Sequence, residues 1–299
     1  MNRMDAPIRP PLRWLILLWL PFCLWSQPLQ AQLVFVTHEP LPLVQDLANR
    51  TAELTGRTVQ VRLLAEQRAL SPQQYQAAVL VGPQALAGWN NRSLPAVAVF
   101  VSRADVAAAQ PAPVSAIYTE PPLSRQLALI RLLLGEGVPV GVLLQDRAFW
   151  PVSGLAGLDL AGAGVTPYYL SDYDSLNHAL LELLRENRAL LGVYDPQLYN
   201  AANIKTILIS AYRRSIPLLG PGSAYLRAGA LATTYSGNAE VAQRLHEILN
   251  AGLADGLWPA PAYNPYFRVG INPQVARSLN LLVPDSDELE RQLQGQEKR

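Results

Sequence analysis

Short apolar runs, each followed by a stretch with helical spacing, recur along this chain and constrain its fold more than any other feature. The clearest runs cover residues 77–81 (AAVLV) and 96–101 (AVAVFV). Continuous runs of this length, without polar alternation, are typical of strands that are buried on both faces of a parallel sheet. The alternation of such strands with helices therefore predicts an α/β protein.

The pattern occurs as two successive series. In the first, we expect strands at 33–36, 58–64, 77–81, 96–101 and 114–118, with a helix at 40–55 that Gly56 ends. The second begins with a helix at 123–134, a strand at 138–144 and a short extended segment at 167–170. A helix at 171–187 follows, with Ser171 as its N-cap and Asp172 and Asp174 in its first turn. The repetition predicts two α/β lobes with a cleft between them.

Residues 190–235 continue the second series. We expect a strand at 190–194, a turn and helix start at 195–200, a helix at 202–213, a strand at 216–219, a glycine-rich loop and a third strand. Because strands in such a run are parallel, Asp195 and the 220–223 loop would meet at one crevice at their carboxyl ends.

The last part of the chain contains a predicted helix at 238–250, bounded by Gly237 and Gly252, and a surface segment at 258–265 that is rich in proline and aromatic residues. A strand at 267–271 and a helix at 273–279 follow. The polar tail, residues 284–299, is expected to fray.

The first 31 residues have the three parts of a secretory signal. Arg3, Arg9 and Arg13 form a basic start, residues 14–25 (WLILLWLPFCLW) an apolar run, and Leu29-Gln30-Ala31 a small-residue end. The apolar run is shorter than the roughly 20 residues that a spanning helix needs, so we expect cleavage after Ala31; retention as an anchor is the alternative. The only cysteine, Cys23, follows Pro-Phe, which is a poor context for lipoprotein processing.

The charge balance argues against a nucleic-acid partner. The whole chain has a formal net charge of +1, and this falls to −1 without the signal segment, which carries three arginines and one aspartate. Phosphate contacts need clustered Lys and Arg, and no block of like charge occurs. At 50% apolar residues, the chain can bury one large core or two moderate ones.

Motifs for catalysis, nucleotides or metals are missing from the sequence. There is no phosphate-binding loop, no dinucleotide-binding glycine pattern and no nucleophile elbow; the nearest stretch, 220–224 (GPGSA), lacks the final glycine of the elbow. His178 and His246 fall in predicted helices, and no histidine belongs to a metal-ligand pair. We expect no catalytic residues, no metal and no cofactor, although Glu120 and Asp146 end strands where carboxylates can act.

Several residues at predicted strand ends are candidates for ligand contact. His38 follows the first strand and either bonds a small molecule or is a solvated loop residue. Asp195 either caps a helix or meets a cationic ligand group. Tyr199 and Tyr225 either stack on a planar ligand or cover the core, and Ser223 can donate from its loop.

Three stretches of the chain resemble a known family: 192–200 (GVYDPQLYN), 207–217 (ILISAYRRSIP) and 220–235 (GPGSAYLRAGALATTY). They are similar to the extracytoplasmic substrate-binding proteins of bacterial ABC importers, in the family that includes tryptophan and tyrosine binders. The resemblance implies the type I periplasmic-binding fold, with two Rossmann-like lobes, parallel sheets, three crossovers and a hinge cleft. It also implies a first lobe of residues 32–119 and 236–262, a second lobe of residues 120–235 and 263–283, and a flexible tail at 284–299.

Two loops depart from the family pattern. Gly220-Pro221-Gly222 stands where the family has Gly-aromatic-Ser, with the serine one place later at Ser223, and the loop after residue 144 reads QDRAFWPVSG. Both loops would touch ligand, so the resemblance predicts the fold better than it predicts the ligand specificity. An aromatic amino acid is one candidate ligand.

The sequence thus predicts a monomeric periplasmic solute-binding protein that passes a small molecule, such as an amino acid or related metabolite, to an ABC permease in the inner membrane. A secreted sensor that signals to a membrane receptor is the alternative, and an α/β enzyme is a weaker third. The expected ligand-binding residues come from both lobes: Thr37, His38, Gly82, Gln84, Ser102, Glu120, Asp146, Asp195, Tyr199, Ser223 and Tyr225.

Overall fold

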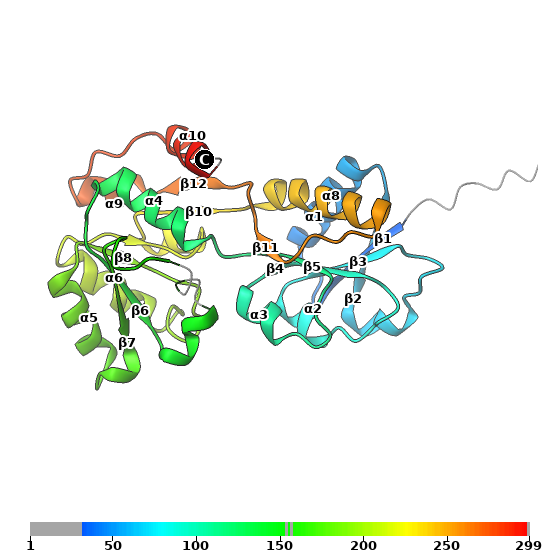
Figure 1. The fold of residues 1–299 in the computed structure, drawn as a ribbon, viewed down its shortest axis with the longest axis horizontal. Helices are drawn as coiled ribbons and strands as arrows, with labels where there is room; N and C mark the ends of the chain where they lie inside the picture. The colour runs from blue at the N-terminus through cyan, green and yellow to red at the C-terminus, as the bar shows by residue number, and fades with distance from the viewer. Residues whose placement is uncertain (1–31, 153–154, 156–157, 298–299) are drawn as a thin grey trace, which may run out of the picture. The chain divides into compact units, whose positions relative to one another are not determined.

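The computed structural model describes residues 32–152, 155 and 158–297 of the chain. The expected signal segment, residues 1–31, lies outside the described residues. The described chain forms two six-stranded sheets, each wrapped by helices, and the two-lobed α/β architecture expected from the sequence is confirmed (Figure 1).

The first sheet is wholly parallel and has the order β2-β1-β3-β4-β5-β11. Its strands are β1 (Gln32–Thr37), β2 (Thr58–Leu63), β3 (Ala77–Val81), β4 (Ala96–Val101), β5 (Ser115–Tyr118) and β11 (Ala262–Tyr263). Helices α1 (Pro42–Thr55) and α8 (Asn238–Asp255) cover one face, while α2 (Pro83–Gly88) and α3 (Arg103–Ala108) cover the other (Figure 1). A 3₁₀ turn, η1 (Leu64–Ala69), follows β2.

Alternate residues of each strand feed two separate cores in this lobe. Phe35 and Val79 pack with residues of α1 and α8, whereas Val36 and Leu80 pack with Leu86 and its neighbours in α2. The central strands β3 and β4 are apolar throughout because both of their faces are buried, whereas the edge strand β2 is partly exposed and carries Gln60 and Arg62.

The second sheet has the same order of strands, β7-β6-β8-β9-β10-β12, with only β12 antiparallel. Its strands are β6 (Val140–Leu144), β7 (Val165–Tyr169), β8 (Ala189–Leu191), β9 (Leu218–Leu219), β10 (Ala232–Tyr235) and β12 (Arg268–Ile271). The helices are α4 (Leu123–Leu134), α5 (Leu176–Glu186), α6 (Ile204–Tyr212), α7 (Ala224–Ala228), α9 (Pro273–Ser278) and α10 (Ser286–Glu297). The 3₁₀ turns η2 (Arg147–Val152) and η3 (Leu170–Asp172) follow β6 and β7, and one contiguous core holds the lobe together.

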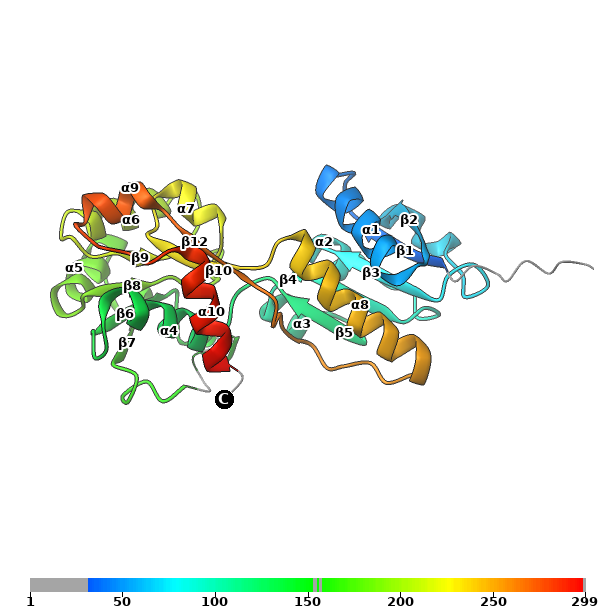
Figure 2. The same ribbon diagram turned by 90° about the horizontal axis from the view of Figure 1, so that it is seen from above.

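The chain passes between the sheets three times, between β5 and α4, between β10 and α8, and between β11 and β12 (Figure 2). In a doubly wound sheet of this order, ligands bind at the carboxyl ends of the strands, near the point where the winding reverses.

Two predicted helix boundaries were wrong. The helix expected at 171–187 begins only after Ser175, whose Oγ accepts the backbone N–H of His178 at 3.2 Å, while Asp172 is held by Arg147 at 2.8 Å. Helix α8 runs through Gly252 and ends at Gly256, which has a φ of 70°. A Cβ on Gly252 would collide with the indole of Trp258, so this glycine serves close packing and not helix termination.

The prediction of a frayed tail was also wrong. Residues 286–297 form α10, in which Leu289 and Leu293 are fully buried. The segment is polar on average because its solvent face is charged, yet one face is apolar and packs on the second lobe. Four further elements were not among those expected: the short helices α2 and α3 after β3 and β4, α7 in the stretch taken for loop and strand, and β11 in the segment taken for surface.

Candidate functional site

The carboxyl edge of the first sheet contains a hollow of about 340 Å³. Four of the predicted ligand residues line it, namely Thr37, His38, Gly82 and Gln84, with Glu39, Leu41, Leu43, Val44, Val81, Pro83 and Phe100. His38 and Gln84 are exposed, whereas Thr37 is buried and its hydroxyl donates to the carbonyl of Glu39 at 2.8 Å. The hollow forms where β1 and β3 end side by side, β1 leading through residues 38–41 into α1 and β3 through Gly82 into α2.

Gly82 and Phe100 shape this hollow through unusual backbone conformations. Gly82 has a φ of 88° at the start of α2, a conformation that glycine adopts without steric cost. Phe100 has a φ of 54°, at a shift in register between β4 and β5. A bulge of this kind re-aims a side chain, here at the hollow. Sequence reasoning missed Phe100 because its apolar run predicts an unbroken strand.

Ser102 and Glu120 lie at the ends of β4 and β5. The Ser102 hydroxyl and backbone N–H both donate to Asp105 Oδ2, at 2.6 and 2.7 Å, and the serine caps α3. Ser102 therefore has a structural partner in the lobe. Glu120 Oε1 accepts the backbone N–H of Arg103 at 2.8 Å, and burial raises the pKa of the Glu120 carboxyl to about 7.

In the second lobe, Asp195 is buried and holds two strand ends together. Its carboxylate accepts the backbone N–H groups of Gln197 and Leu198 at 3.0 and 3.2 Å, and that of Gln145 at 3.2 Å. Its oxygens thus bond the backbone of a turn. The helix start expected at 195–200 was wrong, because α6 begins only at Ile204, so Asp195 orders a turn and does not cap a helix. The ligand contact expected at Asp195 stays a prediction.

Tyr199 and Tyr225 also make contacts within the lobe. Tyr199 is buried and its hydroxyl donates to the carbonyl of Leu143 at 3.2 Å, and burial raises the pKa of its phenol. The Tyr225 hydroxyl donates to the carbonyl of Tyr199 at 2.6 Å, although its ring is only partly buried. Tyr199 therefore covers the core, and only Tyr225 keeps a surface for a ligand.

Asp146 and Ser223 lie in the loops that follow β6 and β9. Asp146 Oδ1 accepts the backbone N–H of Phe149 at 3.1 Å and so orders the start of its loop. Ser223 is exposed, directly before α7, with no side-chain hydrogen bond to the helix. Both side chains remain accessible.

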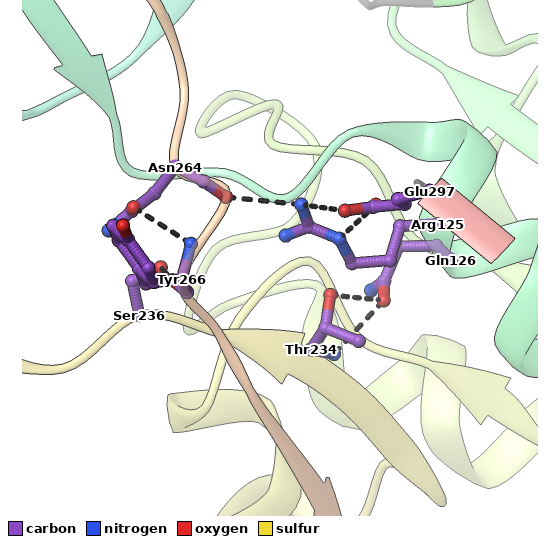
Figure 3. Close-up of polar contacts among 7 residues, drawn as sticks. All are labelled: Arg125, Gln126, Thr234, Ser236, Asn264, Tyr266 and Glu297. Atoms are coloured by element: carbon purple, nitrogen blue, oxygen red, sulfur yellow. Dashed lines mark hydrogen bonds and ion pairs between the residues drawn. The ribbon is translucent and has the colours of Figure 1, made fainter. Parts of the chain in front are cut away.

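A buried polar network ties the start of α4 to the neighbouring segments (Figure 3). The Gln126 amide donates to the carbonyl of Gly220 at 2.8 Å and accepts both the backbone N–H and the hydroxyl of Thr234 at 3.0 Å. Arg125, 4% exposed at its side chain, bonds Glu297 of α10 at 2.6 Å.

The same network reaches the third crossover. The Arg125 guanidinium donates to the carbonyl of Asn264 at 3.1 Å, and Ser236 in the second crossover donates to the carbonyl of Tyr266 at 2.7 Å (Figure 3). Sequence reasoning missed these residues; the available signal was the Arg-Gln pair at 125–126 within a largely apolar helix, 123–134. The network thus ties the start of α4 to the segments around the second and third crossovers.

Within the described ranges, no group of three or more His, Cys, Asp or Glu side chains could hold a metal ion, and no helix is long and apolar enough to cross a membrane. The candidate polar side chains of the second lobe bond mainly to backbone groups, so they order the loops in which they lie.

Comparison with known proteins supports the fold. No protein-family model matches the chain, and no curated protein matches its sequence. Several solved structures match over most of their length. An ABC domain in complex with L-Trp from Streptococcus pneumoniae is 13% identical, with a TM-score of 0.53, covering 86% of this chain and 97% of that one.

Two further solved structures match about the same share of this chain. A substrate binding protein with adhesive properties from Clostridium difficile, in its ligand-free open form, is 11% identical with a TM-score of 0.66, covering 86% of this chain and 97% of its own. A periplasmic ribose ABC transporter protein from Conexibacter woesei is 11% identical with a TM-score of 0.52, covering 87% and 97%. At such identities the likeness concerns the fold, and the chain has the type I periplasmic-binding fold.

Proposed function

We propose that this protein is an extracytoplasmic solute-binding protein, which captures a small molecule between its two lobes and delivers it to an ABC permease. The observation that carries the proposal is the hollow at the carboxyl edge of the first sheet, where Thr37, His38, Gly82 and Gln84 come together in a fold with three crossovers. Small-molecule sites in α/β sheets occur at this edge.

The mechanism would be a hinge equilibrium with no chemical step. A ligand that contacts both lobes binds the closed form better than the open form and shifts the population toward it. The first-lobe hollow would hold the ligand first. Asp146 and Ser223, whose polar side chains remain accessible on the second lobe, and the partly exposed ring of Tyr225 would contact it on closure.

The similar structures support capture of a small molecule and differ in its identity, since one holds L-Trp and another is described as a ribose transporter. Delivery to a permease and residence outside the cytoplasm rest on the signal-like residues 1–31 and on this likeness. The protein would act as a monomer.

A thermal-shift panel tests the proposal. Melting temperatures would be measured with the 20 common amino acids, simple sugars and related metabolites. A ligand present at 100 times its Kd stabilises a protein by about 2.7 kcal/mol, which should raise the melting temperature by about 5 °C.

A matched pair of variants locates the effect. Phe100→Ala removes a ring from the hollow and should abolish the shift, whereas Leu257→Ala, at a position 72% exposed and outside the hollow, should leave it unchanged. A panel in which no compound raises the melting temperature would refute the proposal. If a binder is found, deletion of the gene should abolish uptake of that compound; intact uptake with a lost cellular response would instead identify a sensor.

A further inference from the structure

Glu120 is a largely buried carboxylate, of which only one oxygen has a hydrogen-bond partner. Its Oε1 accepts the backbone N–H of Arg103 at 2.8 Å. Its Oε2 is buried and, within the described part of the chain, accepts no hydrogen bond of normal geometry. Buried polar atoms nearly always have a partner, so an unpaired carboxylate oxygen indicates a missing one.

Glu120 also lines a small hollow between chain segments that follow strand ends. The hollow is lined by residues of the first crossover, of the end of β8 and of the loop after β9: Glu120, Pro121, Leu123, Gly192, Val193, Tyr194 and Pro221. Its volume is about 10 Å³, enough for one group of the size of a water molecule. A terminal ammonium group has a similar size.

The surroundings of Glu120 supply little positive charge. Arg103 lowers the pKa of its carboxyl and Asp105 raises it, both from α3, and burial outweighs them. The other titratable groups that face it are phenols: Tyr118 of β5, Tyr263 of β11 and Tyr194 after β8. Arg103 is itself hydrogen-bonded to Tyr263.

The other carboxylates at these sheet edges are already satisfied. Asp195 accepts three backbone N–H groups, and Asp105 accepts the hydroxyl and N–H of Ser102. Asp146 bonds the backbone through Oδ1 alone, but it is only partly buried, so water can solvate its second oxygen. Among the candidate residues that the structure describes, Glu120 is therefore the one whose carboxylate has a buried oxygen without a hydrogen-bond partner.

We propose that Glu120 anchors a ligand that carries a primary ammonium group, which occupies the small hollow and donates to Oε2. This inference rests on the proposed function and names the ligand class. A cation is favoured over a hydroxyl because a buried carboxylate without a counter-charge is costly, and a charge-assisted hydrogen bond compensates that cost more fully. An amine-bearing molecule such as an amino acid fits this requirement better than a neutral sugar does.

Paired compounds test the proposal in the intact protein. Binding of L-tryptophan and L-leucine, of their amine-free analogues indole-3-propionate and 4-methylpentanoate, and of D-ribose would be measured by calorimetry, after the thermal panel. Any further binder from the panel would be compared with its own amine-free analogue. Loss of the amine should weaken binding by about 10- to 100-fold, the range for a hydrogen bond to a charged group.

Glu120→Gln should weaken binding of the amine-bearing compound by a similar factor and leave binding of its amine-free analogue unchanged. Glu136→Gln, at a side chain 84% exposed, is the matched control and should change neither. Because the carboxylate form is required, affinity for the amine-bearing compound should rise about 10-fold from pH 6 to pH 8, with proton release on binding. Glu120→Gln should remove this pH dependence, and its far-UV circular dichroism should match that of the parent.

The outcomes distinguish failure of the ammonium site from failure of the solute-binding function. If compounds bind but the amine-free analogues bind equally well, or if Glu120→Gln changes neither affinity nor its pH dependence, the ammonium site is refuted while the solute-binding function stands. If the only binder is D-ribose or another sugar, the ammonium site is likewise refuted. A protein that binds nothing in the panel refutes the proposed function and the ligand class together.

Discussion

Removal of Glu297 tests whether the last helix is an integral part of the second lobe. Its carboxylate accepts hydrogen bonds from Nε and one terminal nitrogen of Arg125, at 2.6 and 3.0 Å. The Arg125 side chain is 4% exposed, and its guanidinium also donates to Asn264 and lies 3.8 Å from the centre of the Phe267 ring. In Glu297→Ala, the buried cation would keep these two contacts and lose its counter-charge.

The magnitude follows from the burial of the two partners. Breaking a fully buried ion pair from one side costs about 3–5 kcal/mol, because the remaining charge is left uncompensated. Glu297 is 35% exposed, so water can reach the vacated position and reduce this cost. We therefore expect a loss of about 2 kcal/mol in the free energy of unfolding.

Urea denaturation followed by circular dichroism measures the effect, with the midpoint shifted and the slope unchanged. Gln296→Ala, at the neighbouring exposed position, is the control and should stay within about 0.5 kcal/mol of the parent. Arg125→Met combined with Glu297→Ala should recover part of the loss, since it removes the uncompensated charge. Equal stability of Glu297→Ala and Gln296→Ala would refute a structural role for the pair.

Three further predictions concern single positions. Gly252→Ala should cost about 1–3 kcal/mol in urea unfolding, because the new Cβ meets the Trp258 indole; an unchanged midpoint would contradict the close packing. Ser175→Ala should cost about 1 kcal/mol through loss of the α5 cap, and Ser171→Ala distinctly less; the reverse order would restore the earlier helix start. The pKa of Glu120 is raised on folding, so ionisation of this carboxyl lowers the free energy of unfolding of the ligand-free protein increasingly from about pH 4.5 to pH 7. Glu120→Gln should therefore raise the free energy of unfolding by roughly 1–3 kcal/mol at pH 8 and leave it unchanged at pH 4, as urea unfolding at the two pH values would measure.

Most of the fold could be predicted because strands buried on both faces need continuous apolar runs. The runs at 77–81 and 96–101 coincide with β3 and β4, and the predicted helix at 123–134 coincides with α4. Errors occurred where a local signal has two uses. Gly252 matches a helix stop, but the indole of Trp258 requires a glycine inside the helix. A single sequence does not distinguish these uses, because Trp258 approaches only after the chain has folded back.

The candidate site was predictable only as a set of positions. Residues that follow parallel strands gather at one edge, so Thr37, His38, Gly82 and Gln84 could be assigned to one hollow from their places after β1 and β3. Their individual roles could not be assigned, because a carboxylate at a strand end serves either a ligand or the backbone. Asp195 serves the backbone, whereas Glu120 retains an unpaired oxygen.

The order of apolar runs and helical stretches by itself determined the two α/β lobes and the edge at which polar residues collect, since these depend on periodicity along the chain. Tertiary structure alone decided which side chains are satisfied, because hydrogen-bond partners such as Arg125 and Glu297 are 172 residues apart in sequence. It also decided that the polar end of the chain is a packed helix, because the apolar face formed by Leu289 and Leu293 becomes buried only against the rest of the lobe.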